Sequence, residues 1–245
     1  MRLFMYPYYR DESQQSIVRA VRIAAAAAAM LAAHSSHGQA SASVSLTSEY
    51  SARGQSLSDG RASPQLSLSW DGVQGWYAGA FAAPRLTLAR RTGVAKMVAF
   101  GGYAHRLRSG LSWEAGASST VFSDLRGYNY NETWLGLASD RLSARLYYAP
   151  AYYGYFGRVA YAELNGFHPI GERINLIAHV GVLHGLRGLT AAMRDRIDVR
   201  LAVGVDAGPC NVQLAWLGTT TFGSGRAANG FRTPRALAVT ATYSF

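Results

Sequence analysis

The chain offers few side chains that could perform acid–base or nucleophilic chemistry. Beyond residue 42, the candidates are His105, His168, His179, His184 and Cys210. An outer-membrane hydrolase needs a serine or an acid beside a histidine. No serine lies within two residues of His184, and Ser123 and Asp124 have no histidine near them in the sequence. No His, Cys and acid cluster has the spacing of metal ligands. The sequence therefore favours no catalytic residue, no metal and no cofactor.

A second set of charged and titratable side chains lies on consecutive segments in which polar and apolar residues alternate. The segments carrying Arg145, Glu163, His179 and Arg200 could fold back about residues 154, 171 and 190. This folding places Arg145 beside Glu163, Glu163 beside His179, and His179 beside Arg200. The row is either a structural pairing of charges or a constriction that contacts a solute. The predicted pore-lining residues are Arg145, Glu163, His179, Arg200, Glu132, Glu114, Tyr147 and Tyr161.

Strands are the elements that would position these side chains, since a period of two puts alternate residues on one face. In the clearest segment, Ile197, Val199 and Leu201 alternate with Arg196, Asp198 and Arg200. The alternating segments are 42–50, 63–71, 75–83, 96–107, 110–121, 129–139, 141–151, 158–169, 173–184, 196–206, 210–221 and 235–245. Most have the length that a tilted membrane strand needs. The pattern predicts an all-β fold, an antiparallel transmembrane β-barrel of about 12 strands, with about 10 to 14 compatible.

The connections between these segments alternate in length. The long ones are 51–62, 84–95, 122–128, 152–157, 185–195 and 222–234, and the tight ones are 72–74, 108–109, 140, 171–172 and 208–209. Outer-membrane barrels have long external loops and short periplasmic turns. The alternation predicts that both chain ends lie on the periplasmic side.

The N-terminal residues have the order of a secretory signal. Residues 1–22 are polar and contain arginines, residues 23–33 are apolar without interruption, and Ala40-Ser41-Ala42 has small residues at alternate positions. This order predicts a signal peptide over residues 1–40, with cleavage after Ala40 or Ala42. Residues 41–245 would then form the barrel domain.

The C-terminal segment ends on an aromatic residue. Val239, Ala241, Tyr243 and Phe245 share one face, as expected for an aromatic girdle at the membrane interface. We expect Tyr243 and Phe245 to act as a membrane-insertion signal read by the barrel-assembly machinery. The predicted location is the cell outer membrane, with its lipid and lipopolysaccharide as partners.

The formal charge of +10 is carried almost entirely by arginine. No basic run or clustered patch is present, so nucleic-acid binding is not expected. The predicted strands place the excess in external connections, with outer-loop basic residues Arg85, Arg90, Arg91, Lys96, Arg226 and Arg232. These arginines could bind the phosphates of lipopolysaccharide or steer anionic solutes towards the barrel mouth.

Five segments, in order, resemble the TorF-type family of small outer-membrane porins. Residues 46–50 (LTSEY) and 53–60 (RGQSLSDG) resemble its signature LTSDY followed by RGxSxSDG. The other segments are 130–136, 147–154, 161–169 and 178–181. Glu49 replaces the usual aspartate, and Ala151 stands where an acid is common. The resemblance implies a porin-like barrel without a known substrate.

These observations favour a porin that passes small polar solutes, anionic ones included, by passive diffusion. The alternative is a closed barrel with a role in adhesion or envelope integrity, and a less favoured one is a hydrolase of lipids or peptides. Twelve strands give a backbone radius of roughly 12–13 Å. This lies between barrels filled by side chains and open porins, so the sequence leaves the state of the lumen open.

Overall fold

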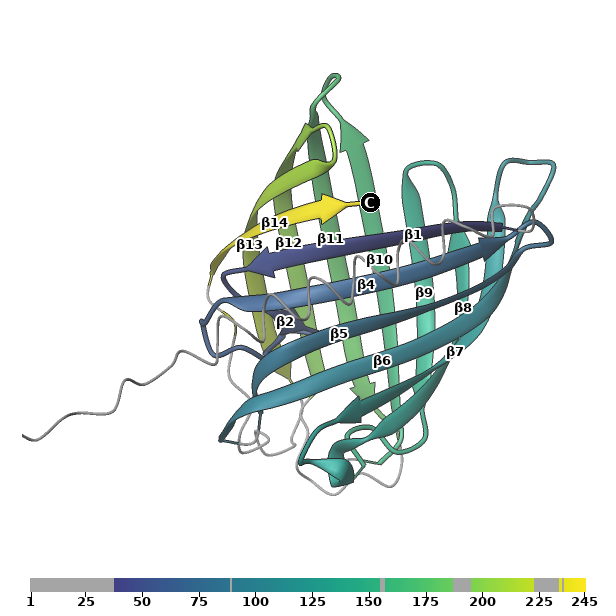
Figure 1. Ribbon diagram of the computed structural model, residues 1–245. Helices are drawn as coiled ribbons and strands as arrows, with labels where there is room; N and C mark the ends of the chain where they lie inside the picture. The colour runs from purple at the N-terminus through teal and green to yellow at the C-terminus, as the bar shows by residue number, and fades with distance from the viewer. Residues whose placement is uncertain (1–37, 89, 155–156, 187–194, 223–233, 235) are drawn as a thin grey trace, which may run out of the picture.

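The computed structural model describes residues 38–88, 90–154, 157–186, 195–222, 234 and 236–245 (Figure 1). The first 37 residues of the predicted signal peptide lie outside these ranges, as do Arg226 and Arg232. The first strand begins at Gly38, so the predicted cleavage positions fall within it. No helix in the described ranges is long and apolar enough to cross a membrane.

Twelve antiparallel strands of the described chain close into a barrel, with the first strand paired to the last. They are β1 (Gly38–Thr47), β4 (Ser63–Gly72), β5 (Trp76–Leu88), β6 (Arg91–Arg106), β7 (Ser112–Phe122), β8 (Tyr130–Ala138), β9 (Leu142–Ala149), β10 (Val159–Pro169), β11 (Ile174–Gly185), β12 (Asp195–Ala207), β13 (Cys210–Phe222) and β14 (Leu237–Ser244). Strands β2 (Ser51–Ala52) and β3 (Gln55–Ser56) form a separate hairpin. One short 3-10 helix spans Arg126–Tyr128.

The alternation of side chains separates an apolar outer face from a polar inner face. Leu46, Leu135, Leu146, Leu201 and Leu214 are among the large apolar side chains exposed on the outside. Water would solvate such a surface poorly, whereas lipid tails match it. A closed barrel also leaves no strand edge unpaired, which a membrane requires.

The predicted strands agree with the observed ones except at the first strand and at one connection. The first strand was predicted over 42–50, whereas β1 spans Gly38–Thr47, so Glu49 and Tyr50 lie in the loop that follows it. The connection 84–95 was predicted as a long loop, whereas residues 84–88 belong to β5 and residues 91–95 to β6, with Leu88 paired to Arg91. The cause is the side chains of Leu86, Leu88 and Val94, which alternate inwards and become buried. The predicted external position of Lys96 was therefore wrong, because its side chain is buried inside the barrel beside Tyr50.

The long connections gather at one end of the barrel, the loop end, and the short turns at the other, the turn end. The interior of the loop end is filled by a hydrophobic core. Its members include Leu57, Leu86, Leu88, Val94, Phe122, Tyr130, Tyr152, Tyr153 and Leu183. This packing resembles the core of a soluble domain, and it restricts open space to the remaining part of the lumen.

Candidate functional site

The loop after β1 folds into the lumen and carries the β2–β3 hairpin. Arg53 and Gly54 at its tip both have positive φ, 49° and 69°, as a two-residue type I′ turn requires. A Cβ atom on Gly54 would lie 2.8 Å from Arg196 Cδ and 2.8 Å from Thr219 Oγ1. The hairpin tip is therefore in close contact with the wall formed by β12 and β13.

The base of this hairpin is fixed by Glu49. Its carboxylate accepts hydrogen bonds from Ser56 Oγ at 2.6 Å and from Ser58 Oγ at 3.3 Å. Ser58 Oγ in turn accepts from the backbone N–H of Tyr50 at 2.8 Å. The segment that resembles the porin signature is thus the inward-folded loop itself, and Glu49 makes these bonds in place of the usual aspartate.

Arg53 reaches across the lumen and is held by charge and aromatic contacts. Its guanidinium donates two hydrogen bonds to Glu132 of β8, at 2.6 and 3.1 Å. Its Cζ lies 4.5 Å from the ring centre of Tyr161 and 5.1 Å from that of Tyr147, within the range of cation–π attraction. On the other side, Arg196 donates to the Arg53 carbonyl oxygen at 3.0 Å.

Both members of the Arg53–Glu132 pair are largely shielded, with side chains 13% and 8% exposed. Burial lowers the pKa of Arg53, but the interactions with Tyr152 and Glu132 more than offset it, so the pKa stands well above its ordinary value. Arg53 therefore remains charged. A charge-assisted bidentate pair of this kind fixes the hairpin tip in the lumen.

A hydrogen-bonded chain of inward side chains lines the lumen wall from β5 to β10; we call it the lumen network. Trp134 donates to Tyr77 OH at 3.2 Å, and Tyr77 donates to Glu114 at 2.8 Å. Arg145 Nε donates to the other oxygen of Glu114 at 2.5 Å. Tyr147 then accepts from Arg145 at 3.4 Å and donates to Glu163 at 3.1 Å.

A second polar group continues around the wall on β10, β11 and β12. His179 contacts Asp198 Oδ1 through Nε2 at 3.0 Å and Asn165 Oδ1 through Nδ1 at 2.7 Å. Tyr161 OH donates to both oxygens of Asp198 at 3.3 Å. Both ring nitrogens of His179 thus lie within hydrogen-bonding distance of side-chain oxygens.

Glycines in the wall make room for these contacts. Gly136 lies between Glu114 and Arg145, and a Cβ there would lie 2.7 Å from Glu114 Oε1. Gly181 faces the Tyr161 hydroxyl, which would lie 2.0 Å from such a Cβ. Side chains at either position would displace polar groups of the wall.

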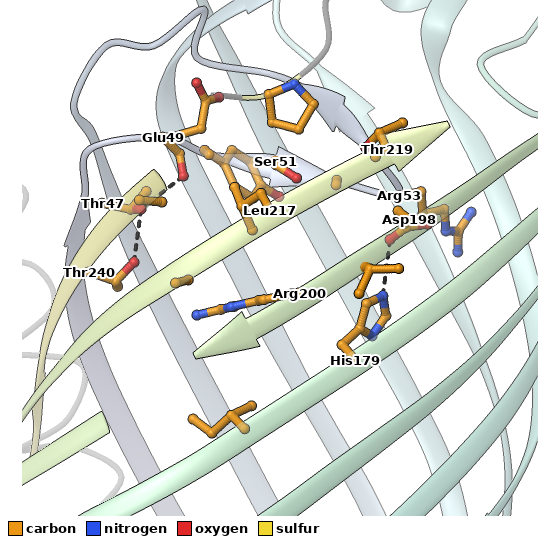
Figure 2. Close-up of a pocket in the computed structure, with 18 of the residues that line it drawn as sticks. Thr47, Glu49, Ser51, Arg53, His179, Asp198, Arg200, Leu217, Thr219 and Thr240 are labelled. Atoms are coloured by element: carbon orange, nitrogen blue, oxygen red, sulfur yellow. Dashed lines mark hydrogen bonds and ion pairs between the residues drawn. The ribbon is translucent and has the colours of Figure 1, made fainter. Parts of the chain in front are cut away.

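A cavity of about 610 Å³ remains between the hairpin and the opposite wall (Figure 2). The hairpin side contributes Glu49, Ser51, Ala52, Arg53 and Gly54. The opposite side contributes residues of β1 and of β10 to β14, including Thr47, Glu163, His179, Asp198, Arg200, Gln213, Thr219, Thr240 and Thr242. Its lining runs along β13 from Gln213, near the turn end, to Thr219, near the loop end. The open space is therefore off the barrel axis.

The structure brings together most of the predicted pore-lining residues. Arg145 lies opposite Glu163, and His179 lies opposite Arg200, both as predicted. The predicted neighbour of His179 was wrong, because Asn165 and not Glu163 lies opposite it. The turn between β10 and β11 is centred on Glu172 and not on Gly171, since Pro169 pairs with Asn175. The register therefore differs from the predicted one by two residues. Because a shift of two keeps each side chain on the same face, the predicted lumen residues still point inwards.

Arg145 was predicted to form an ion pair with Glu163, but its partner in the structure is a different carboxylate. Arg145 binds Glu114 across Gly136, and no cation lies within 4.0 Å of Glu163 among the described residues. Of the predicted pore-lining residues, Tyr147, Tyr161, Glu163, His179 and Arg200 line the cavity, whereas Glu114, Glu132 and Arg145 lie outside its lining.

Other predicted positions lie on the outside of the barrel. Arg85, Arg90 and Arg91 are exposed on the β5–β6 hairpin at the loop end. Tyr243 and Phe245 are exposed on the outer face, with ring centres 4.9 Å apart. Arg53 and Arg196 are lumen residues that the sequence did not indicate. The hairpin signal Arg53-Gly54 was present, but its inward direction depends on the distant Glu132.

The described residues offer little for catalysis or metal binding. His184 contacts Asp195 at 2.7 Å near the loop end, and no serine or threonine is bonded to His184 among the described side chains. No cluster of three potential metal ligands was found in the described part of the chain.

Solved structures with a similar fold include two porins. The KdgM porin, solved in complex with disordered oligogalacturonate, matches with a TM-score of 0.52 and 12% identity, over 84% of this chain and 98% of KdgM. The NanC porin matches with a TM-score of 0.51 and 10% identity, over 84% of this chain and 99% of NanC. At these identities the likeness concerns the fold alone. No curated protein sequence matches this chain.

The apolar outer surface and the closed fold together place the protein in the outer membrane. A family model described as "bacterial protein of unknown function (Gcw_chp)" matches residues 31–244. The match covers the whole barrel, and the chain therefore belongs to the Gcw_chp family.

Proposed function

We propose that this protein is an outer-membrane channel through which small polar solutes diffuse passively. The observation that carries the proposal is the off-axis cavity, which is lined by hydroxyl, amide and charged groups along much of the barrel height. Such a lining can replace part of a solute's hydration shell. The resemblance to TorF-type porins supports the same function, because its signature lies in the loop that forms one wall of the cavity.

The proposed pathway passes beside the hairpin and not through the centre of the barrel. The Arg53–Glu132 pair and the hydrophobic core fill the side formed by β5 to β9 at the loop end. The side formed by β13, β14 and β1 carries small or hydroxylated inward residues such as Ala215, Ala238 and Thr240. Solutes would therefore move along this side.

A closed barrel with a role in adhesion or envelope integrity is the second candidate. It is favoured by the contacts of the hairpin tip with both Glu132 and Arg196, on opposite sides of the lumen. In that case the hairpin would block solutes, and the cavity would be only a recess.

Single-channel recording in planar bilayers distinguishes the two candidates. The purified protein should be inserted after its folding has been checked by its heat-dependent mobility on gels. We expect discrete conductance steps in KCl for the channel. Folded protein that gives no steps at any salt concentration would support the closed barrel.

We further propose partners for two groups of exposed side chains, the arginines of the β5–β6 hairpin and the aromatic residues at the C-terminus. The exposed Arg85, Arg90 and Arg91 would bind lipopolysaccharide phosphates, since the guanidinium fork matches phosphate oxygens. Tyr243 and Phe245 would be read by the barrel-assembly machinery. Deletion of Phe245 should lower the yield of outer-membrane protein relative to a conservative Phe245→Tyr variant.

A further inference from the structure

Arg200 differs from Arg53 and Arg145 in having no acidic partner. Arg196 also forms no ion pair among the described residues, but it donates to the Arg53 carbonyl oxygen at 3.0 Å. Arg53 binds Glu132 and Arg145 binds Glu114. Arg200 donates through Nη2 only to the amide oxygen of Gln213, at 2.7 Å, and its buried Nε–H has no hydrogen-bond partner. Among the described residues, no carboxylate lies within 4.0 Å of it.

The nearest acids are already engaged by other groups. Asp198, two residues away on the same face of β12, is bonded to His179 and Tyr161. Asp206 connects to Arg200 only through two amides, since Gln213 donates to Asn211 at 2.9 Å and Asn211 donates to Asp206 at 2.6 Å. The charge of Arg200 is therefore not neutralised by direct contact.

The guanidinium of Arg200 faces a wall of hydroxyl groups. Gln213 lies opposite Thr240, and Thr240 lies opposite Thr47. Figure 2 shows the Arg200 side chain pointing towards the side of the cavity that carries Thr47 and Thr240. Thr240 donates to Thr47 Oγ1 and Thr47 donates to the Glu49 carbonyl oxygen, both at 2.9 Å. Because each hydroxyl has one hydrogen, these donors are already engaged, and the guanidinium of Arg200 is the donor that this region offers to a solute.

We propose that Arg200 is the binding point for an oxyanion, a carboxylate or phosphate group on a solute in the cavity. The inference rests on the proposed channel function and names the chemical class of solute. A guanidinium offers paired donors to a planar carboxylate or a phosphate, and confinement strengthens the attraction relative to bulk water.

The same cavity limits the charge that such a solute can carry. Glu49, Glu163 and Asp198 also line it. These carboxylates repel a second negative group, because like charges in a confined space cannot both be compensated by one arginine. The site is therefore suited to a monoanion, whose remaining surface is hydroxylated or neutral.

Binding can be measured on the whole protein in detergent, independently of conduction. Inorganic phosphate is titrated at constant ionic strength near pH 6, where the monoanion predominates, and its ³¹P line width is recorded. We expect saturable broadening with the wild type. Arg200→Gln should weaken the apparent affinity about tenfold, the effect of losing one charged hydrogen-bonding partner. Arg200→Lys, which keeps the charge, should retain part of the affinity.

Arg106→Gln is the matched control, because it removes the same charge from an exposed position at the turn end, where the Arg106 side chain is 63% exposed. All variants must keep the heat-dependent gel mobility of the folded barrel. Affinity that is unchanged in Arg200→Gln, or lost equally in Arg106→Gln, would overturn the Arg200 site. Adding acetate as a competitor shows whether carboxylates occupy the same position, and a failure of both anions to bind would also overturn it.

The same samples, recorded in planar bilayers, separate the two proposals. Channels without phosphate binding would remove the Arg200 site and leave the channel function in place. Arg200-dependent phosphate binding without channels would support the site and remove the proposed function.

Discussion

Gly181 shows how one residue without a side chain determines what the lumen contains. Its neighbours across the sheet are Glu163 and Asp198, and the space above it is filled by the hydroxyl of Tyr161. That hydroxyl donates to Asp198, which also contacts His179. The polar group at the centre of the cavity wall therefore depends on a glycine at position 181.

Replacing Gly181 by alanine should destabilise the barrel by about 1–3 kcal/mol, the typical cost of overpacking. The new Cβ would lie 2.0 Å from the Tyr161 hydroxyl oxygen and 2.8 Å from Asp198 Oδ2. The urea midpoint of unfolding in lipid vesicles measures the change. Gly166→Ala is the control, because its Cβ faces outwards with ordinary contacts of 3.5 Å or more.

Adding Tyr161→Phe to Gly181→Ala tests the cause, since it removes the hydroxyl that collides with the new Cβ. The double variant should recover part of the lost stability. A Gly181→Ala variant as stable as Gly166→Ala would contradict the account of the wall.

The buried pair at the hairpin tip should matter far more than an exposed one. Glu132→Gln leaves the charge of Arg53 buried without its partner, which should cost about 3–5 kcal/mol. Arg106→Gln removes an exposed pair with Asp140, whose side chains are 63% and 79% exposed, and should cost about 0–1 kcal/mol. Equal shifts of the urea midpoint would show that the Arg53–Glu132 pair is not buried.

At the scale of elements, the β2–β3 hairpin divides the lumen. One side is packed against Glu132 and the tyrosines of β9 and β10, and the other side borders the cavity. Two short strands thus decide how much of a twelve-stranded barrel is open. The barrel wall sets only the outer limit of the pore.

Shortening the hairpin should widen the pore. Replacing residues 51–56 by two glycines removes Arg53 and the cavity wall next to it, so single-channel conductance in KCl should increase severalfold. A control shortened at the tip of the β5–β6 hairpin, where Arg90 and Arg91 are exposed, should conduct like the wild type. A shortened β2–β3 hairpin with unchanged conductance would place the pathway elsewhere.

The barrel strands could be predicted from the sequence because each has lipid on one face and the lumen on the other. This environment imposes alternation directly on residue types, as in 196–206. The same alternation predicted that the side chains of Arg145, Glu163, His179 and Arg200 point into the lumen. Parity survived even where the register was wrong by two residues, at the turn around Glu172.

The loops could not be predicted in this way, because their positions depend on distant partners. Arg53 was placed outside as a loop residue, but Glu132 and Tyr161, far away in the sequence, hold it in the lumen. Residues 84–95 appeared to be a loop because Pro84, Arg90 and Arg91 interrupt the apolar pattern. Burial of Leu86, Leu88 and Val94 under the β1–β4 loop makes the extended hairpin stable.

At the scale of the whole molecule, the account makes a prediction about orientation. The loop end should face the exterior and the turn end the periplasm, as in barrels with long external loops. In a Cys210→Ser background, a cysteine at Arg91 should react on intact cells with a reagent that cannot cross the membrane. A cysteine at Asp140 should react only after the outer membrane is opened. Cys210 must be replaced because it is exposed at a turn.

The reverse labelling pattern would show that the barrel is inserted in the opposite sense. Labelling of both positions on intact cells would indicate damaged membranes, so retention of a soluble periplasmic marker serves as the control.

The most direct test of the central claim, an off-axis channel beside the hairpin, is cysteine block of single-channel current. Thr240 lines the cavity, whereas the next residue, Ala241, faces lipid on the same strand. In the Cys210→Ser background, a bulky polar thiol reagent should sharply reduce the conductance of Thr240→Cys and leave that of Ala241→Cys unchanged. Folded protein without channels, or a Thr240→Cys current that resists the reagent after complete labelling, would contradict the account.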